Sequence, residues 1–436
     1  ILQTCGVIEN HSLCITIGII AFLRVLRLDC LEKFLTIIQD NGMNEETFVK
    51  NIHILHKNEI VDIYENQVVR FSDQCLSDYI LKYIFFDKRV ISLSNMIRVC
   101  FGVCREKTIS AVNTLLNIFI NEDVTCFVRD EVRRLWDELE KEENPLLEDF
   151  VKAFFRVNPT KTLRILRDKI KNEKCITRKW KDIDTKAGKN YQHVNNEIIE
   201  LLSGFADTSE FSSACSLFFE YYKKRPDLYI DFYHAVNSNF SINRNSKYSD
   251  YITQIIFFKT MQKYSCNWSD ELVCGLFFDL ISHFLKMEFS VSEFNRGQTM
   301  TLYFIPLNLS KGVKEYRKII WEALITLSSC KADEIKIFLQ SYGSCSRRGI
   351  DTSVLKFDLE YISLIVKKIF SINKLADCIL INKLVEIFDG KHISCKSIFR
   401  EYLENESLKI YFLLKGETSW EYIDHEERTK KIKDNI

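Results

Sequence analysis

Residues that interrupt regular secondary structure are scarce in this chain. Its 436 residues include only 4 prolines and 13 glycines, while 46% are hydrophobic. A β-sandwich or β-barrel of this length needs many more turn residues, because each of its short strands ends in a turn. The composition therefore predicts a mainly helical protein that is long enough to bury several cores and to hold more than one domain.

A short segment at residues 28–85 departs from this helical pattern. Apolar residues at helical spacing predict a helix at 28–38, and Asn44 is placed to cap a second helix that follows. Two β-rich runs come next, at 60–64 and 67–71, separated by two residues of the type that close tight hairpins. The segment is therefore predicted to contain two helices, a two-stranded hairpin and a further helix.

The second β-rich run leads directly into the last of these helices. It passes through Arg70, Phe71, Ser72 and Asp73, of which the last two are placed to cap the helix. Residues 68–81 resemble the end of the winged-helix domain in signal-transducing STAND NTPases, the NACHT-like ATPases of bacterial antiviral defence and their relatives. In that family a strand that ends in Arg-Phe-Ser, or a close variant, enters a helix of the form Leu-x-x-Tyr-Leu.

A second segment extends the resemblance. Residues 154–163, with Pro159 near their centre, are similar to the helix–Pro–helix step of the helical arm that follows the winged helix in STAND NTPases. Residues 217–256 resemble a continuation of that arm, so the likeness covers about the first 260 residues. Asp73 stands where many relatives carry a nucleotide-sensing histidine, and its negative charge is expected to repel a phosphate at that place.

The resemblance implies a mainly α fold in which a small winged-helix domain is followed by an irregular HEAT-like α-helical array. The chain starts with Ile rather than Met and is interpreted as a fragment that lacks an ATPase module. The expected divisions are a helical segment leading out of that module at 1–27, the winged-helix domain at 28–90, a helical arm at 91–260 and a distal, sensor-like helical-repeat region at 261–436.

The resemblance also implies a role and partners. The chain is expected to be the regulatory and sensing portion of a STAND NTPase, coupling a protein trigger, viral in the case of antiviral defence, to nucleotide-dependent homo-oligomerisation. Its first partner is its own N-terminal ATPase domain, which is expected to bind ATP or ADP and Mg. Arg70, Phe71, Ser72 and Asp73 are the residues expected to contact that nucleotide-bearing domain.

Motifs for catalysis are missing from the sequence itself. No Gly-x-x-x-x-Gly-Lys-Ser/Thr loop occurs anywhere, and the pairs Gly188-Lys189 and Gly390-Lys391 lack the upstream glycine that a phosphate-binding loop needs. No serine-nucleophile elbow or paired-carboxylate signature is present either. We therefore predict that this segment is not an enzyme and holds no cofactor of its own.

Cysteine is abundant, with 15 residues scattered singly through helical segments. No secretory signal is visible, so reduced thiols in a cytoplasmic protein are predicted. Cys100 and Cys104 are one helical turn apart and could bind zinc together with His53 or His56. The spacing is atypical of zinc knuckles, and buried packing is the favoured interpretation, so no metal site is predicted.

The charge balance argues against nucleic acid and membranes as partners. Lys and Arg number 60 and Asp and Glu also number 60, which leaves no net field to attract polyanions. The second predicted helix carries Glu45 and Glu46 against Lys50 and Lys57, so it lacks the basic face that a DNA-reading helix needs.

The rest of the chain reads as successive helices with two interruptions. Residues 171–191 are rich in Lys and Arg and are interpreted as an exposed loop, and residues 299–309 are predicted to be extended. Aromatic residues are dense after residue 237, where they either fill seams between helices or form an exposed apolar patch that receives the trigger. The residues concerned are Tyr251, Phe257, Phe258, Trp268, Phe277 and Phe278.

A different class of function is also compatible with the sequence. Helices stacked one after another over this length are typical of an α-solenoid. Such an array can act as a stand-alone scaffold that binds a protein or peptide without any nucleotide.

Overall fold

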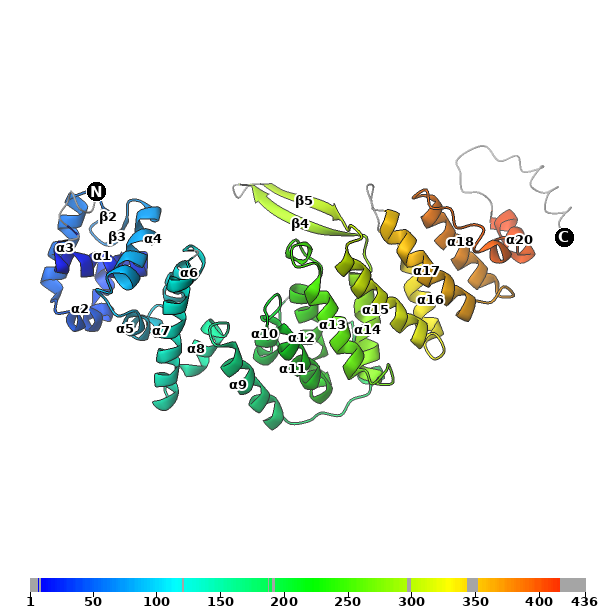
Figure 1. Cartoon of the computed structure of the whole chain (residues 1–436), viewed down its shortest axis with the longest axis horizontal. Coiled ribbons are helices and arrows are strands. Elements are labelled where there is room, and N and C mark those ends of the chain that lie inside the picture. The colour runs from blue at the N-terminus through cyan, green and yellow to red at the C-terminus, as the bar shows by residue number, and fades with distance from the viewer. Residues whose placement is uncertain are drawn as a thin grey trace. The chain divides into compact units, whose positions relative to one another are not determined.

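The computed structural model describes residues 7, 9–119, 121–186, 188–189, 193–295, 299–342 and 352–415. Helices dominate these residues, from α1 (His11–Leu23) to α20 (Glu406–Lys415), and strands are few (Figure 1). The prediction of a mainly helical protein is therefore confirmed. The chain divides into two compact units, Ile1–Thr162 and Leu163–Ile436.

The first unit is built around α1, which is buried on all sides. Its apolar residues leave almost no surface exposed, and it contacts three α-helices, the short π-helix η2 and two strands of the unit. Gly18 permits a close approach, since a Cβ there would lie 2.7 Å from Cγ2 of Ile84. The elements around α1 are β1 (Val25–Arg27), α3 (Glu45–Lys57), β3 (Val68–Phe71), α4 (Gln74–Lys82), η2 (Tyr83–Asp87) and α6 (Arg105–Asn117).

A three-stranded antiparallel sheet lies in this unit, with the order β1-β3-β2. β2 (Val61–Tyr64) pairs with β3, and Val61 lies opposite Phe71. Glu65 and Asn66 connect the two strands with φ values of 51° and 55°, as a tight type I′ hairpin requires. The predicted hairpin is confirmed, and Phe71 points into the core as expected. β1 was not predicted, because three residues carry no periodic signal.

The helices of this segment follow the predicted order with one difference in detail. Asn44 caps α3, as predicted, by accepting a hydrogen bond from the backbone N–H of Thr47 at 2.8 Å. The helix predicted at 28–38 is instead a 3₁₀ helix, η1, with a kink at Cys30, followed by a short α-helix that begins after the non-helical backbone of Phe34. The remaining elements of the unit are η1 (Leu28–Phe34), α2 (Leu35–Asp40), α5 (Leu93–Phe101), α7 (Glu122–Lys141), α8 (Leu147–Phe154) and the start of α9 (Pro159–Asn172).

The predicted domain boundaries at 27/28 and 90/91 fall inside the first compact unit, and the boundary at 260/261 falls inside the second. The core around α1 is shared by the described residues before 28, by residues 28–90 and by the start of the predicted arm. The division into four domains stays a prediction.

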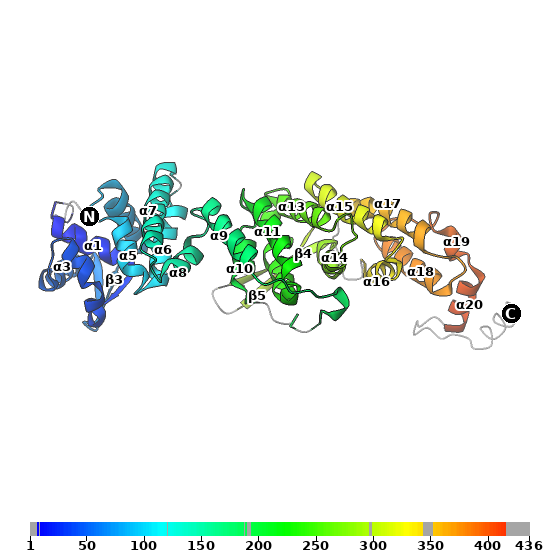
Figure 2. The same cartoon turned by 90° about the horizontal axis from the view of Figure 1, so that it is seen from below.

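The second unit is a two-layered array of helices. α11, α13, α15 and α17 contact one another in succession along one side, and α14, α16, α18 and α20 do so along the other (Figure 2). The elements are α10 (Glu197–Ser203), α11 (Phe211–Lys224), α12 (Tyr229–Ala235), α13 (Ile252–Tyr264), α14 (Glu271–Phe284), α15 (Lys311–Leu327), α16 (Ala332–Ser341), α17 (Thr352–Ile369), α18 (Leu375–Asp389) and α19 (Arg400–Leu403), with short turns η3 (Trp180–Asp182), η4 (Pro226–Leu228), η5 (Val236–Phe240) and η6 (Asn245–Lys247).

Aromatic side chains fill the seams of this array. Phe257 is fully buried, stacks on Phe284 and packs edge-on against Phe258. Of the six aromatic residues after residue 237 considered for an exposed patch, five are buried and Phe278 is partly buried. The alternative of an exposed aromatic patch is therefore wrong for these residues, which serve as core.

A buried ion pair ties four elements of the array together. Arg317 of α15 and Asp358 of α17 are both fully buried and are joined by two hydrogen bonds. Trp321 Nε1 and the Tyr342 hydroxyl also donate to Asp358, at 2.7 and 2.6 Å. The Arg317 guanidinium donates to the Lys286 carbonyl, at 3.0 Å, just beyond the end of α14. Burial opposes the charge, but Asp358 holds the pKa of Arg317 above its ordinary value.

One hairpin projects from the helical array. β4 (Glu288–Asn295) pairs antiparallel with β5 (Thr299–Pro306), and Figure 1 shows the two strands extending beyond the neighbouring helices. The extended segment predicted at 299–309 is confirmed, whereas β4 was not predicted. Across the described part of the chain, the helices are too short or too polar to cross a membrane.

Candidate functional site

The predicted interdomain residues lie where β3 passes into α4. Arg70 is exposed on β3, and its guanidinium carbon lies 4.6 Å from the ring centre of Tyr64 on β2. Its Nη2 and Nε donate to the Tyr64 hydroxyl at 2.6 and 3.1 Å. These contacts hold an exposed cation in one place on the hairpin, directly across from Asp62 on β2, whose carboxylate accepts a hydrogen bond from the same Tyr64 hydroxyl.

The other three predicted residues have different surroundings. Phe71 is buried, whereas Ser72 and Asp73 are exposed. The backbone N–H of Ser72 donates to the Ile60 carbonyl at 3.3 Å, which closes the base of the hairpin. Thus the structure places Arg70, Ser72 and Asp73 at the surface of one strand–helix junction and Phe71 beneath it.

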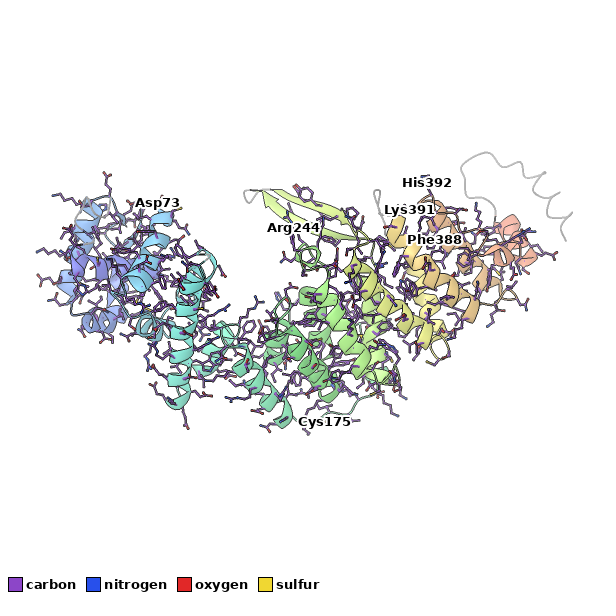
Figure 3. The ribbon with its side chains drawn as sticks, in the orientation of Figure 1. Asp73, Cys175, Arg244, Phe388, Lys391 and His392 are labelled. Atoms are coloured by element: carbon purple, nitrogen blue, oxygen red, sulfur yellow. The ribbon has the colours of Figure 1, made fainter. Side chains whose placement is uncertain are left out.

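Asp73 (labelled in Figure 3) acts as the N-cap of α4. Its Oδ1 accepts a hydrogen bond from the backbone N–H of Leu76 at 2.7 Å, as its predicted capping role requires. A carboxylate at this position occupies the positive end of the helix, where an anion such as phosphate would otherwise be favoured. Of the four predicted residues, Arg70 alone carries a positive charge that could bind an anion at this junction.

Arg24 fastens this junction to the rest of the unit, and the sequence analysis did not identify it as a site residue. Its guanidinium forms an ion pair with Asp78 and donates to Ser77 Oγ at 3.0 Å, both on α4. It also donates to Thr114 Oγ1 of α6 at 2.9 Å. Arg24 has φ 63°, an uncommon value for a residue with a side chain. In the sequence, the sign that Arg24 has a special role is that its charge interrupts the apolar residues 15–28.

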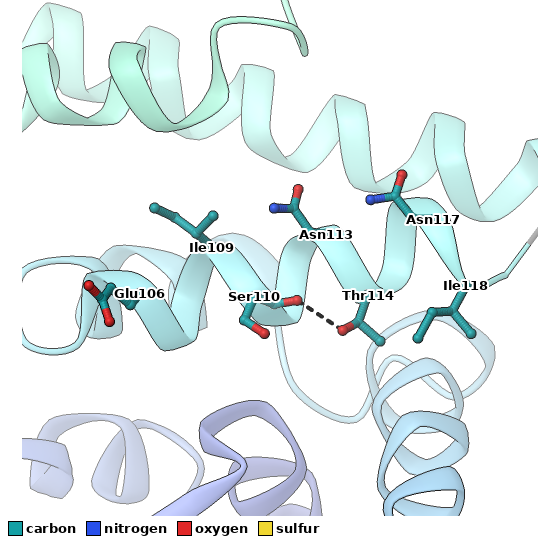
Figure 4. A pocket seen from close by; sticks show the side chains of 7 residues that line it. All are labelled: Glu106, Ile109, Ser110, Asn113, Thr114, Asn117 and Ile118. Atoms are coloured by element: carbon teal, nitrogen blue, oxygen red, sulfur yellow. Dashed lines mark hydrogen bonds between the residues drawn. The ribbon is translucent and has the colours of Figure 1, made fainter. Parts of the chain in front are cut away.

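The face of α6 next to this contact is hollowed (Figure 4). The hollow has a volume of about 550 Å³, and Thr114, which binds Arg24, is part of its wall. Five of the seven lining residues have polar side chains, although apolar atoms make up more of the exposed lining, so the surface offers a partner both hydrogen bonds and apolar contact. The lining residues are Glu106, Ile109, Ser110, Asn113, Thr114, Asn117 and Ile118.

The cysteine and histidine residues considered for zinc do not converge. Cys100 is buried at the end of α5, and Cys104 follows at the start of α6. His56 Nδ1 lies 2.9 Å from the Val61 carbonyl, a backbone contact. Within the described ranges, no group of three or more His, Cys, Asp or Glu side chains could hold a metal ion.

The two thiols nevertheless influence each other. A hydrogen bond from the Cys100 thiol, aided by Thr108 and Lys107, lowers the pKa of Cys104 to about 7 against the effect of burial. The same contact, together with burial, raises the pKa of Cys100. Cys104 is therefore the more reactive thiol of the pair, because the thiolate is the nucleophilic form.

The two Gly-Lys pairs occupy unrelated places in the second unit. Lys391 and His392 (Figure 3) lie just after α18, and the Lys391 N–H donates to the Phe388 carbonyl at 3.0 Å in an ordinary helix-terminal turn. Gly188 and Lys189 lie in the connection between α9 and α10.

No protein-family model, no curated protein and no solved structure matches this chain.

Proposed function

We propose that this chain is the regulatory and sensing portion of a STAND-type, NACHT-like NTPase. The observation that carries the proposal is the strand–helix junction at Arg70–Asp73, in which a tight β2–β3 hairpin runs directly into the Asp73-capped α4. Together with the preceding α2 and α3, this order of elements supports the proposed winged-helix domain. Arg70 is the exposed residue best suited to bind an acidic or phosphate-bearing surface of an ATPase domain.

The second unit supports the sensing part of the proposal. Its two layers of successive helices support the proposed HEAT-like array, a type of fold that presents an extended surface to a protein partner. In the proposed mechanism, a protein trigger of viral origin binds the array and favours an open, oligomerising state over a closed, nucleotide-bound one. Such a shift needs a trigger that binds the open state more tightly than the closed one. ATP or ADP and Mg belong to the ATPase domain in this proposal.

The Arg70 junction provides the test. In the complete protein, Arg70→Glu should change nucleotide-dependent oligomerisation, because it reverses the exposed charge that faces the ATPase domain. Lys57→Glu is the matched control, since Lys57 is an exposed residue of α3 and the charge change is the same. Oligomer size is measured by light scattering with ATP and with ADP. Equal behaviour of both variants and the unmodified protein would refute the assignment of Arg70.

A stand-alone α-solenoid scaffold is the second candidate function. It is favoured by the second unit, in which successive helices bury their aromatic seams against one another. The two candidates differ in what the gene encodes immediately before Ile1. A phosphate-binding loop there supports the STAND assignment, whereas a start codon at or next to Ile1 supports the scaffold.

A further inference from the structure

The connection between α9 and α10 is unusual in its length and in how it is held. The described residues that follow α9, 173–186 and 188–189, contact α14 through the short turn η3 (Figure 1). Among the described residues of this connection, the short turn η3 is the one regular element. Long connections of this kind in folded proteins are usually functional or disordered. We call residues 173–189 the strap.

Trp180 anchors the middle of the strap on α14. Its indole lies directly over Gly275, where a Cβ would come within 2.0 Å of the ring. It also packs edge-on against the ring of Tyr229, with centroids 5.4 Å apart. Glycine at position 275 is therefore required for the strap to lie where it does, and the strap is docked on this face of the array.

Lys189 anchors the end of the strap in a group of aromatic and acidic side chains. Its ammonium lies 2.8 Å from Oδ2 of Asp279, 4.6 Å from the ring centre of Tyr233 and 6.0 Å from that of Tyr229. A carboxylate beside two electron-rich ring faces is the usual chemistry for binding an ammonium group. The ring of Tyr229 is fixed because its hydroxyl donates to the same Asp279 carboxylate.

The surrounding groups keep this site suited to a cation. His283 lies 3.1 Å from the Tyr233 hydroxyl, and burial, with help from Lys286 and Lys189, lowers the pKa of His283 to about 4. The imidazole is therefore neutral at physiological pH and adds no positive charge. His234 Nε2 lies 2.9 Å from the carbonyl of Gly188, so the backbone next to the bound lysine also has a fixed partner.

The occupant of the site is only partly enclosed. The side chains of Lys189 and Asp279 keep 27% and 25% of their surface exposed. Ile176 of the strap donates its backbone N–H to the Lys224 carbonyl of α11 at 2.9 Å, and Glu173 donates to the Lys169 carbonyl of α9, where the strap begins. Displacing Lys189 would break its contacts with Asp279 and Tyr233 and disturb the contact between the Gly188 carbonyl and the buried His234, while the Tyr229–Asp279 hydrogen bond between α12 and α14 remains.

We propose that Tyr229, Tyr233 and Asp279 form a binding site for a lysine side chain of a partner protein, and that Lys189 occupies this site in competition with the partner. The chain's own lysine identifies the chemistry of the ligand: an ammonium on a flexible alkyl stem, carried by an irregular backbone segment. The inference depends on the proposed function in one respect: the partner lysine is taken to belong to the protein trigger that binds the array. Lysine binding itself can be measured without nucleotide.

In the experiment, Lys189→Met removes the chain's own lysine from the site, and a separate peptide supplies a lysine in its place. The probe is a fluorescent synthetic peptide of residues 183–194, and its matched control peptide carries Lys189→Met. Protein with Lys189→Met should bind the probe about tenfold more tightly than the control peptide, as expected for one ammonium bound by aromatic rings and a carboxylate. The unmodified protein should bind the probe about tenfold more weakly than the vacated protein, because its own Lys189 competes.

Two further variants keep the test decisive. Lys181→Met removes an exposed lysine elsewhere on the strap and should leave probe binding as weak as in the unmodified protein. Adding Asp279→Asn to the Lys189→Met protein keeps the side-chain shape and should abolish the preference for the lysine peptide. Thermal melts verify that each variant is folded. If the vacated protein binds both peptides equally, or neither, Lys189 is a fixed internal contact and the proposal is wrong, whereas the proposed ATPase partnership is untouched.

Discussion

Replacing Asp358 with alanine should destabilise the second unit by about 3–5 kcal/mol, because the change leaves the Arg317 charge buried without its partner. Arg317, Trp321 and Tyr342 all donate to this carboxylate, and both charged side chains are fully buried. A buried donor left without an acceptor costs about 1–3 kcal/mol on its own. These donors share one acceptor, so their costs do not add, and the cost of breaking a buried ion pair is the better guide.

Urea unfolding followed by circular dichroism measures the total loss of stability. Hydrogen–deuterium exchange of α15 and α17 then locates the loss, since these helices carry the ion pair. Glu315→Gln is the control, because Glu315 also forms an ion pair, with Lys259 at 2.6 Å, but in an exposed position. An exposed pair contributes about 0–1 kcal/mol, so this control should unfold almost as the unmodified protein does.

The double variant Arg317→Met, Asp358→Leu examines the reasoning further. It removes both charges together, so the cost of an isolated buried charge disappears and part of the stability should return. The recovery should be incomplete, because the carbonyls at the end of α14 and the donors on Trp321 and Tyr342 lose their partners. A cost below about 1 kcal/mol for Asp358→Ala would refute the view that this network holds the helices together.

Three other predictions follow from the first unit and from the sequence. Phe71→Ala should cost about 3–5 kcal/mol in a urea unfolding measurement, since Phe71 is a large core side chain beneath the hairpin; an unchanged midpoint would contradict its place in the core. Isothermal titration of the 436-residue chain with ATP should give no micromolar binding, because the sequence has no phosphate-binding loop. Alkylation of Cys104 by iodoacetamide should rise with pH and reach half its maximal rate near pH 7, where the thiolate forms. Cys100→Ala should move that midpoint upward, because it removes the hydrogen bond that stabilises the thiolate, and an unmoved midpoint would exclude this cause.

The parts of the fold that could be predicted are those set by neighbouring residues. The caps at Asn44 and Asp73 depend on a side chain and a backbone N–H three residues away, and both are legible in the sequence. The β2–β3 hairpin was predictable for the same reason, because two turn residues with positive φ separate two β-rich runs. Burial of Phe71 followed from the alternation along β3.

The contacts that define the candidate sites could not be predicted because they join distant residues. Arg24 meets Thr114 across 90 positions of the sequence, and Lys189 meets Asp279 across another 90. The periodic patterns of helices and strands relate residues only a few positions apart, so they reveal neither pair. The composition of the basic segment at 171–191 predicts an exposed loop, yet Trp180 and Lys189 within it are partly buried against α12 and α14. Composition gives the average polarity of such a segment, but it does not identify the two residues that fix the position of the segment on the helices.

A comparison of the Arg317 and Lys189 sites of the second unit shows why one cation can be exchanged and the other cannot. The Arg317 guanidinium is completely enclosed and has partners on α17 and beyond the end of α14, so removing it would separate helices and expose several buried polar groups. Lys189 has a single carboxylate partner and a quarter of its side chain in water, and it is carried by a connection rather than by a helix. Solvent can therefore replace its contacts as it leaves, and a lysine of the same chemistry can take its place. The degree of enclosure, more than the presence of an ion pair, separates a structural cation from an exchangeable one.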